Sequence, residues 1–213
     1  MISRHFSFLT IFALFIFVNL ACTSMSVNKN IYIEDGKTSQ HDLRSVNGNI
    51  VVGKDCQING DCQTVNGSID IGERSRADDV QSVNGALTIS PKADIRKDLG
   101  TVNGTITVES GAVVGGDVGT VNGSISLSGT QVEQNLTTVN GDVVLDHNST
   151  VDGDLIVKEK HGDRNMEVRI DIINGSVVKG NLIVEERDRN VTVHLKNGGK
   201  IMGEVKNAKV IEE

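Results

Sequence analysis

The sequence predicts an all-β fold, a single-stranded parallel β-helix (β-solenoid). Three observations predict it: a phrase repeated at a fixed interval, strand-like alternation inside each repeat, and a shortage of aromatic residues. The phrase Val-Asn-Gly occurs six times, always after Ser or Thr, and its asparagines follow one another at steps of 18 or 19. A fixed period near 20 is typical of stacked repeat architectures. Because one repeat cannot bury its apolar side alone, successive repeats have to stack as coils.

Each repeat contains very short segments in which apolar and polar residues alternate. In the repeat 101–119, Ile106 and Val108 alternate with two threonines. This alternation is typical of a half-buried strand, and the apolar positions are rich in β-branched residues. All five phenylalanines precede residue 18, and the chain has no Trp. We therefore expect two or three strands per coil around a thin aliphatic core.

The repeat begins upstream of its first complete copy and lengthens after residue 157. Ser26-Val27-Asn28 aligns with Ser45-Val46-Asn47 at an offset of 19, with Lys29 in the glycine position. Further on, Gly153, Gly180 and Gly203 follow one another at steps of 27 and 23. We expect about nine coils with a period of 18–19, which lengthens to 23–27 near the C-terminus. The segment 26–157 forms the regular solenoid, and 158–213 forms irregular C-terminal coils with charged insertions and a cap.

The repeated asparagines are expected to form a structural ladder at one corner. Asn and Gly tolerate the left-handed conformation of a sharp corner, and asparagines in register can bond amide to amide along a stack. A ligand-binding row is the alternative, but corner geometry alone explains the pattern. The predicted ladder consists of Asn28, Asn47, Asn66, Asn84, Asn103, Asn122 and Asn140.

Residues 1–21 are predicted to be a signal peptide. Arg4 supplies a positive start, and a largely apolar stretch follows from Phe6 to Val18. Such a stretch is short for a membrane span and typical of an export signal, with a retained anchor as the alternative. The Ala21-Cys22 step resembles the cleavage site of bacterial lipoproteins, although the two residues before Ala21 depart from that motif. We expect Cys22 to be the lipid attachment residue and 22–25 to be a short tether, with ordinary cleavage nearby as the rival.

Charge and residue spacing favour a protein without catalytic chemistry. There are 21 basic and 28 acidic residues, a net charge of −7, which argues against nucleic acid. Four histidines of the repeat region, His41, His147, His161 and His194, are scattered among different repeats. We therefore expect no catalytic, cofactor-binding or metal-binding residues and no cofactor.

Two further features keep alternatives open. Cys56 and Cys62 fall in inward positions of one coil, and two buried thiols are favoured over a disulfide. The charged insertions at 158–167 and 185–190 suit binding loops on a rigid rod, although solvated loop tips are the favoured explanation.

The phrase [Ser/Thr]-Val-Asn-Gly-x-Ile-x-[Val/Ile/Leu], repeated from Ser26 to Leu145, resembles exported bacterial β-solenoid proteins of the adhesin-like or polymer-forming cytoskeletal-like type. A more distant likeness is to bactofilins, whose triangular β-helices polymerise end to end. Bactofilins are cytoplasmic, and the leader of this chain departs from that. The resemblance implies the fold and carries over no catalytic residue.

The expected function is a non-enzymatic, exported structural or interaction protein of the bacterial cell envelope, scaffold-like or adhesin-like. It would lie in the periplasm or at the outer membrane, lipid-anchored when Cys22 is modified. The expected partners are the membrane through that lipid, other copies through the solenoid ends, and a glycan or envelope protein. A glycan- or polymer-binding module is the alternative, followed by an enzyme on a β-helix scaffold.

Overall fold

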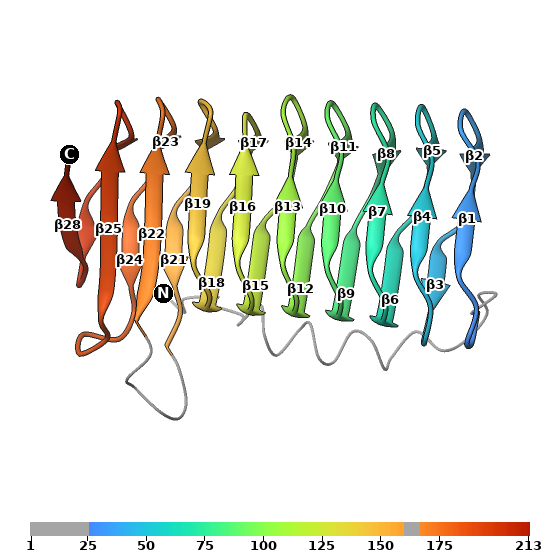
Figure 1. Cartoon of the computed structure of the whole chain (residues 1–213), viewed down its shortest axis with the longest axis horizontal. Coiled ribbons are helices and arrows are strands. Elements are labelled where there is room, and N and C mark those ends of the chain that lie inside the picture. Colours follow the sequence, from blue (N-terminus) through green and yellow to red (C-terminus); the bar gives the residue numbers. More distant parts are fainter. Residues whose placement is uncertain (1–25, 160–166) are drawn as a thin grey trace, which may run out of the picture.

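The computed structural model describes residues 26–159 and 167–213, and these form a three-sided parallel β-solenoid (Figure 1). One sheet has ten strands and the other two have nine each, and every pairing between named strands is parallel. No helix occurs in the part of the chain that the structure describes. The predicted fold class is therefore confirmed.

Each coil contributes one strand to each sheet, which we name sheets A, B and C. Sheet A contains β3 (Leu43–Ser45), β6 (Cys62–Asn66), β9 (Val80–Asn84), β12 (Leu99–Asn103), β15 (Val118–Asn122), β18 (Leu136–Asn140), β21 (Leu155–Val157), β24 (Leu182–Val184) and β27 (Val205–Lys206). Sheet B contains β1 (Ile31–Ile33), β4 (Ile50–Val52), β7 (Ile69–Ile71), β10 (Leu87–Ile89), β13 (Ile106–Val108), β16 (Ile125–Ser128), β19 (Val143–Asp146), β22 (Val168–Ile173), β25 (Val191–Lys196) and β28 (Lys209–Glu212). Sheet C contains β2 (Thr38–Ser39), β5 (Gln57–Ile58), β8 (Arg76–Ala77), β11 (Asp94–Ile95), β14 (Val113–Val114), β17 (Gln131–Val132), β20 (Thr150–Val151), β23 (Val177–Val178) and β26 (Lys200–Ile201).

The register of sheet B confirms the predicted coil lengths. Paired residues are 18 or 19 positions apart as far as Val143. The next two steps are 27, from Val143 to Ile170, and 23, from Ile170 to Val193. The final step shortens to 17, from Val193 to Val210, which the sequence did not indicate.

The core is a narrow aliphatic column with buried hydroxyl side chains at two of its corners. The inward Ile, Leu and Val residues of the middle coils are almost fully buried. The residue before each Val-Asn-Gly also points inward; Thr64, Ser82 and Thr101 are 3% exposed or less. The hydroxyl of Thr64 donates to the Gly48 carbonyl oxygen at 2.9 Å, and that of Ser82 to the Gly67 oxygen at 3.0 Å. This bond satisfies a corner carbonyl of the preceding coil, which explains why Ser or Thr occupies the position.

The left-handed corner lies elsewhere than the sequence suggested. Of the seven asparagines in the predicted ladder, only Asn28 has a positive φ, of 57°. Most left-handed residues instead lie in the turns between sheets B and C, such as Asp55 (φ 55°) and Arg74 (φ 57°). The expectation that the Asn-Gly corner needs this conformation of its asparagine is therefore wrong beyond the first coil.

Close packing between coils explains the corner glycines instead. A Cβ added to Gly104 would lie 2.0 Å from the carbonyl oxygen of Gly85, far inside van der Waals contact. A Cβ at Gly67 would lie 2.2 Å from the Gly48 oxygen. Each corner glycine thus sits directly over the backbone of the one before it, and no side chain fits between them.

Candidate functional surfaces

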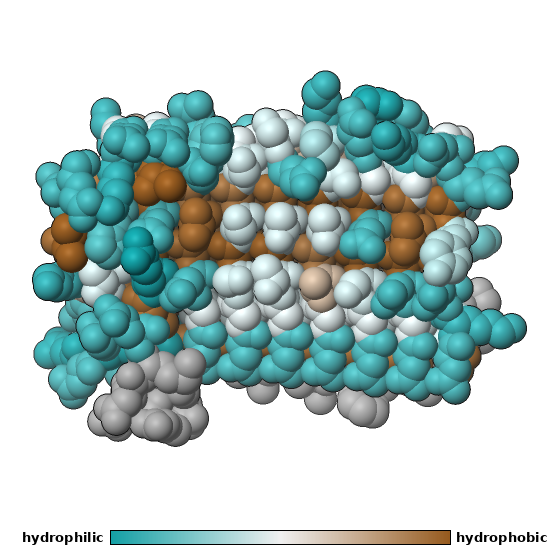
Figure 2. All heavy atoms as spheres, viewed as in Figure 1, coloured by the Kyte–Doolittle hydropathy of each residue, from teal (hydrophilic) through white to brown (hydrophobic). Residues whose placement is uncertain are grey.

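The asparagines of the Val-Asn-Gly phrases form a continuous chain of hydrogen bonds along the edge where the sheet A strands end. We call this set, together with Asn28, the asparagine row. Each Nδ2 donates to the Oδ1 of the asparagine one coil earlier, at 2.7 to 2.9 Å. Figure 2 shows a regular hydrophilic line along this edge of the rod. All of these bonds point toward the N-terminal coil, so the Oδ1 of Asn140 accepts no bond from another asparagine of the row.

A second polar row, which the sequence reasoning missed, lies just before the sheet A strands. We call it the aspartate row; in register it comprises Asp42, Asp61, Asp79, Asp98, Asp117, Asn135, Asp154 and Asn181. The Oδ1 of each residue from Asp42 to Asp154 accepts the backbone N–H of the next row residue, at 2.6 to 3.4 Å, and that of Asn181 accepts the Glu204 N–H at 2.9 Å. The signal was present, because most of these residues recur at the same steps of 18 and 19 as the asparagines.

Like charges accumulate along the aspartate row. Burial, and then the neighbouring carboxylates of Asp79 and Asp42, raise the pKa of Asp61. The pKa of Asp98 is also raised, mainly by burial. Lys97 partly compensates, since its Nζ lies 3.4 Å from Asp79 and 3.8 Å from Asp61. The edge is therefore acidic but internally bonded through its backbone amides.

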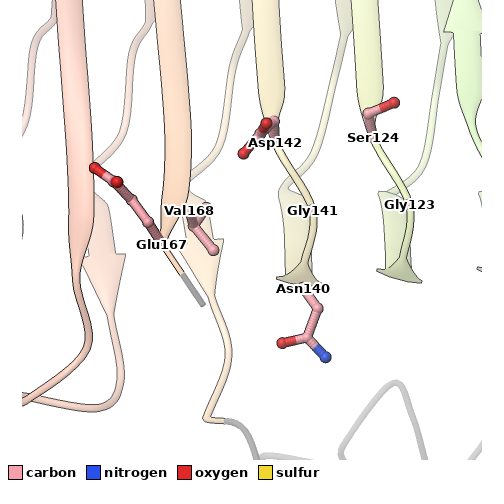
Figure 3. Close-up of a pocket in the computed structure, with 7 residues that line it drawn as sticks. All are labelled: Gly123, Ser124, Asn140, Gly141, Asp142, Glu167 and Val168. Atoms are coloured by element: carbon pink, nitrogen blue, oxygen red, sulfur yellow. The ribbon is translucent and has the colours of Figure 1, made fainter. Parts of the chain in front are cut away.

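The asparagine row ends at the predicted insertions, which lie between sheets A and B. The inward hydroxyl position of Thr138 is taken over by Val157 and then by Val184. A recess of about 290 Å³ opens beside this point, lined by Gly123, Ser124, Asn140, Gly141, Asp142, Glu167 and Val168 (Figure 3). Asp142 accepts the Arg169 N–H at 2.9 Å, and Glu167 accepts the Thr192 hydroxyl at 3.0 Å. Both carboxylates in the recess are bonded to protein donors.

The outer face of sheet B carries hydroxyl groups in adjacent coils. Thr88, Thr107 and Ser126 are paired in register and point outward. Figure 2 shows a pale line of side chains across the middle of the face that it draws. The same line holds Asp70 on one side and Val144 on the other, so the hydroxyl surface spans three coils. The side chains in this area are small and half-buried, and they stand at the spacing of the coils.

The ends of the rod differ from its middle in exposed apolar surface. Among the described residues, the exposed large hydrophobic side chains are Val27, Tyr32, Met202, Val205 and Val210. All lie in the first or last coil. Val205 and Val210 continue the inward positions of Leu182 and Val193, which are fully buried, yet each is 37% exposed. The core is thus open to solvent at the C-terminal end.

A serine, a histidine and an aspartate meet on the surface between sheets B and C. The Nδ1 of His147 lies 2.9 Å from Asp146 Oδ2 and 3.4 Å from Ser128 Oγ. A nucleophilic triad needs the serine and the acid on opposite ring nitrogens, so that one holds the ring while the other takes the proton. Here both contacts use the same nitrogen, and the arrangement does not meet that requirement.

The remaining predicted residues are separated or lie outside the described ranges. Cys22 and His161 fall in the undescribed segments. Cys56 and Cys62 are buried free thiols, and burial raises the pKa of Cys62. Across residues 26–159 and 167–213, no group of three or more His, Cys, Asp or Glu is placed to hold a metal ion. The same residues include no helix long and apolar enough to cross a membrane.

The fold is observed in the structure, whereas the family resemblance of the repeated phrase stays a prediction. No family model, no curated protein and no solved structure matches the chain.

Proposed function

We propose that the protein is a non-enzymatic, exported structural or interaction protein of the bacterial cell envelope, with a scaffold-like or adhesin-like role. The uninterrupted stack carries this proposal: three sheets run in register from the first coil to the last. In such an architecture each coil contacts only its neighbours, and the product is a rod with extended repeating faces. At about 4.8 Å per coil, about nine coils give a rod of roughly 40 Å.

Cross-linking in cells tests this role. We expect the chain in the envelope fraction, cross-linked through outward residues such as Thr107 to itself or to one recurring envelope component. Recovery from the cytoplasm, or an enzymatic turnover that survives purification to homogeneity, would contradict the proposal.

The proposed route to the membrane is a lipid on Cys22. The repeat reaches almost to that residue, because Ser26 already forms a parallel bridge with Ser45. A lipid on Cys22 would therefore hold the rod close against the bilayer. Metabolic lipid labelling should mark the wild-type chain and leave Cys22→Ala unlabelled and released from membranes. A labelled, membrane-bound Cys22→Ala protein would overturn the assignment.

Self-association through the ends is the proposed second contact. It is supported by the unpaired edge strands and by the apolar side chains confined to the terminal coils. Light scattering should show association that rises with concentration and weakens in Val210→Lys. A charge at outward Thr107 should leave it unchanged. A wild-type chain that is monomeric at every concentration would contradict this part.

A glycan- or polymer-binding module is the second candidate function. The observation that favours it is the set of outward hydroxyls at coil spacing on sheet B, which matches a ligand with its own repeat. A glycan array should then give binders that Thr107→Lys weakens. An array without binders would count against this candidate and leave the scaffold role standing.

A further inference from the structure

The two corners between sheets A and B that carry the insertions lack all three contacts that hold the regular corners. In regular coils these are the inward hydroxyl, the asparagine bond and the stacked glycines. In β21 and β24 the hydroxyl position is Val157 and Val184, and the asparagine row has ended at Asn140. The stacked glycines end at Gly141, whose added Cβ would lie 1.7 Å from the Gly123 oxygen. Another set of contacts has to hold the chain at this edge.

The segment 185–190 supplies those contacts through Arg189. This side chain is 6% exposed although it belongs to a charged surface segment. Its Nη1 donates to the Lys158 carbonyl oxygen at 2.8 Å, and its Nη2 donates to Asn140 Oδ1 at 3.1 Å and to the Val139 carbonyl oxygen. Arg189 therefore caps the last acceptor of the asparagine row and reaches across two coils.

Glu185 holds the same stretch of chain from the other side. Its Oε1 accepts the Lys158 ammonium at 2.8 Å, and its Oε2 accepts the Glu159 backbone N–H at 3.2 Å. Lys158 and Glu159 form the start of the first insertion. They are held by one cation and one anion from the second.

The fastening is local because the sheets continue beneath it. β21 and β24 pair through Leu155 to Val157, independently of these side chains. The guanidinium meets three neutral oxygens, and burial lowers the pKa of Arg189 against the opposing effect of Glu186. A buried cation has lost much of its hydration, so these hydrogen bonds are largely offset by desolvation. Contacts of this kind can open without unfolding the coils below.

We propose that residues 185–190 form a strap, fastened by Arg189 and Glu185, that opens and closes as a unit over the end of the asparagine row. Asn140 both receives the Arg189 bond and lines the recess of Figure 3, so the strap and the recess share one wall. Opening the strap frees that wall while the rod stays folded. This inference goes beyond the scaffold role and does not depend on it.

Hydrogen exchange of the full chain tests the strap, comparing wild type with Arg189→Gln. The reporters are the Lys158 amide, which donates to Thr138 O, and the Glu159 amide, which donates to Glu185. We expect their exchange to rise at least tenfold in Arg189→Gln and protease cleavage to begin within 158–190. Amides of β12 and β15 should keep their wild-type rates.

Two further variants make the result decisive. Arg187→Gln, which changes an exposed arginine of the same segment, should exchange like wild type. Glu185→Gln should open the same amides by a smaller factor, and it decides the question if Arg189→Gln does not fold. Unchanged exchange at Lys158 and Glu159 would overturn the proposal. A rise spread equally over β12 and β15 would also overturn it, because Arg189 would then support the whole stack and no separate strap would exist.

Discussion

The asparagine row and the aspartate row flank the same strands of sheet A at the same interval, yet they are bonded differently. An amide is donor and acceptor at once, so each asparagine bonds directly to the next. A carboxylate only accepts, so each aspartate takes a backbone N–H of the next coil and leaves its charge beside the others. The difference shows that a neutral self-complementary side chain can repeat without electrostatic strain, whereas a repeated charge needs relief.

Residues in and beside the aspartate row reduce the repulsion between its carboxylates. Lys97 lies among three carboxylates, and Asn135 and Asn181 stand where other coils have aspartate. The Nδ2 of Asn135 donates to Asp117 Oδ1 at 3.2 Å, in addition to the backbone bond. An amide is therefore compatible with this corner and adds a bond there.

Replacing a glycine by alanine should give the largest difference in stability loss between the two corners. Gly104→Ala places a Cβ 2.0 Å from the Gly85 backbone oxygen, and we expect a loss of about 3 kcal/mol or more, at the upper end for overpacking. A Cβ at Gly116, beside the aspartate row, would lie 2.2 Å from Asp98 Oδ1 and 2.6 Å from the Lys97 carbonyl carbon, so its closest contact is a side-chain atom. Larger residues, Lys97 and Asp78, fill the same position in neighbouring coils.

Gly116→Ala should therefore cost only about 1 kcal/mol. Chemical denaturation measures the losses of both alanine variants. Equal losses would contradict the close-packing explanation of the asparagine corner.

Removing one asparagine should have a smaller effect. Asn103→Ala deletes two side-chain bonds, to Asn84 and from Asn122. Because the row is exposed, we expect a loss of about 1 to 2 kcal/mol in denaturation. Asn59→Ala, which removes amide contacts outside the row, is the matched control and should cost less. A loss no larger than the control's would mean that the row is not cooperative.

Neutralising Lys97 should have the smallest effect. Burial lowers its pKa, but the carboxylates of Asp79, Asp61 and Asp78 outweigh that and raise it. Lys97→Gln should lower stability by about 0.5 kcal/mol at low salt and by less at high salt, as expected for an exposed ion pair. Lys54→Gln, which loses one contact at 3.9 Å, is the control. A loss that does not depend on salt would point to packing instead.

The sequence predicts the repeating part of this molecule well because every coil presents the same pattern of residues again. The strands, the inward slots and the asparagine bonds all follow from one period. The physical role of the corner glycines could not be predicted, since a left-handed turn and a close backbone contact both require glycine. The role of Arg189 could not be predicted either, because a single arginine in a charged segment gives no sign that it folds back onto Val139 of an earlier coil.

The aspartate row shows a different limit. Its residues were aligned at the same period, but a recurring aspartate beside glycine is typical of a surface turn. Only the register reveals that each carboxylate accepts a backbone N–H from the next coil.

The most direct measurement puts an amide into the aspartate row and a carboxylate into the asparagine row. It compares Asp98→Asn with Asn103→Asp in thermal denaturation at pH 7 and pH 4. The pKa of Asp98 is raised in the folded state, so its charged form opposes folding above that pKa, and the penalty fades as the pH falls through it. Asp98→Asn should therefore raise the midpoint at pH 7. Asn103→Asp should lower it, because the new carboxylate cannot donate to Asn84, and both differences should shrink at pH 4. Shifts of the same sign at pH 7 would contradict the account.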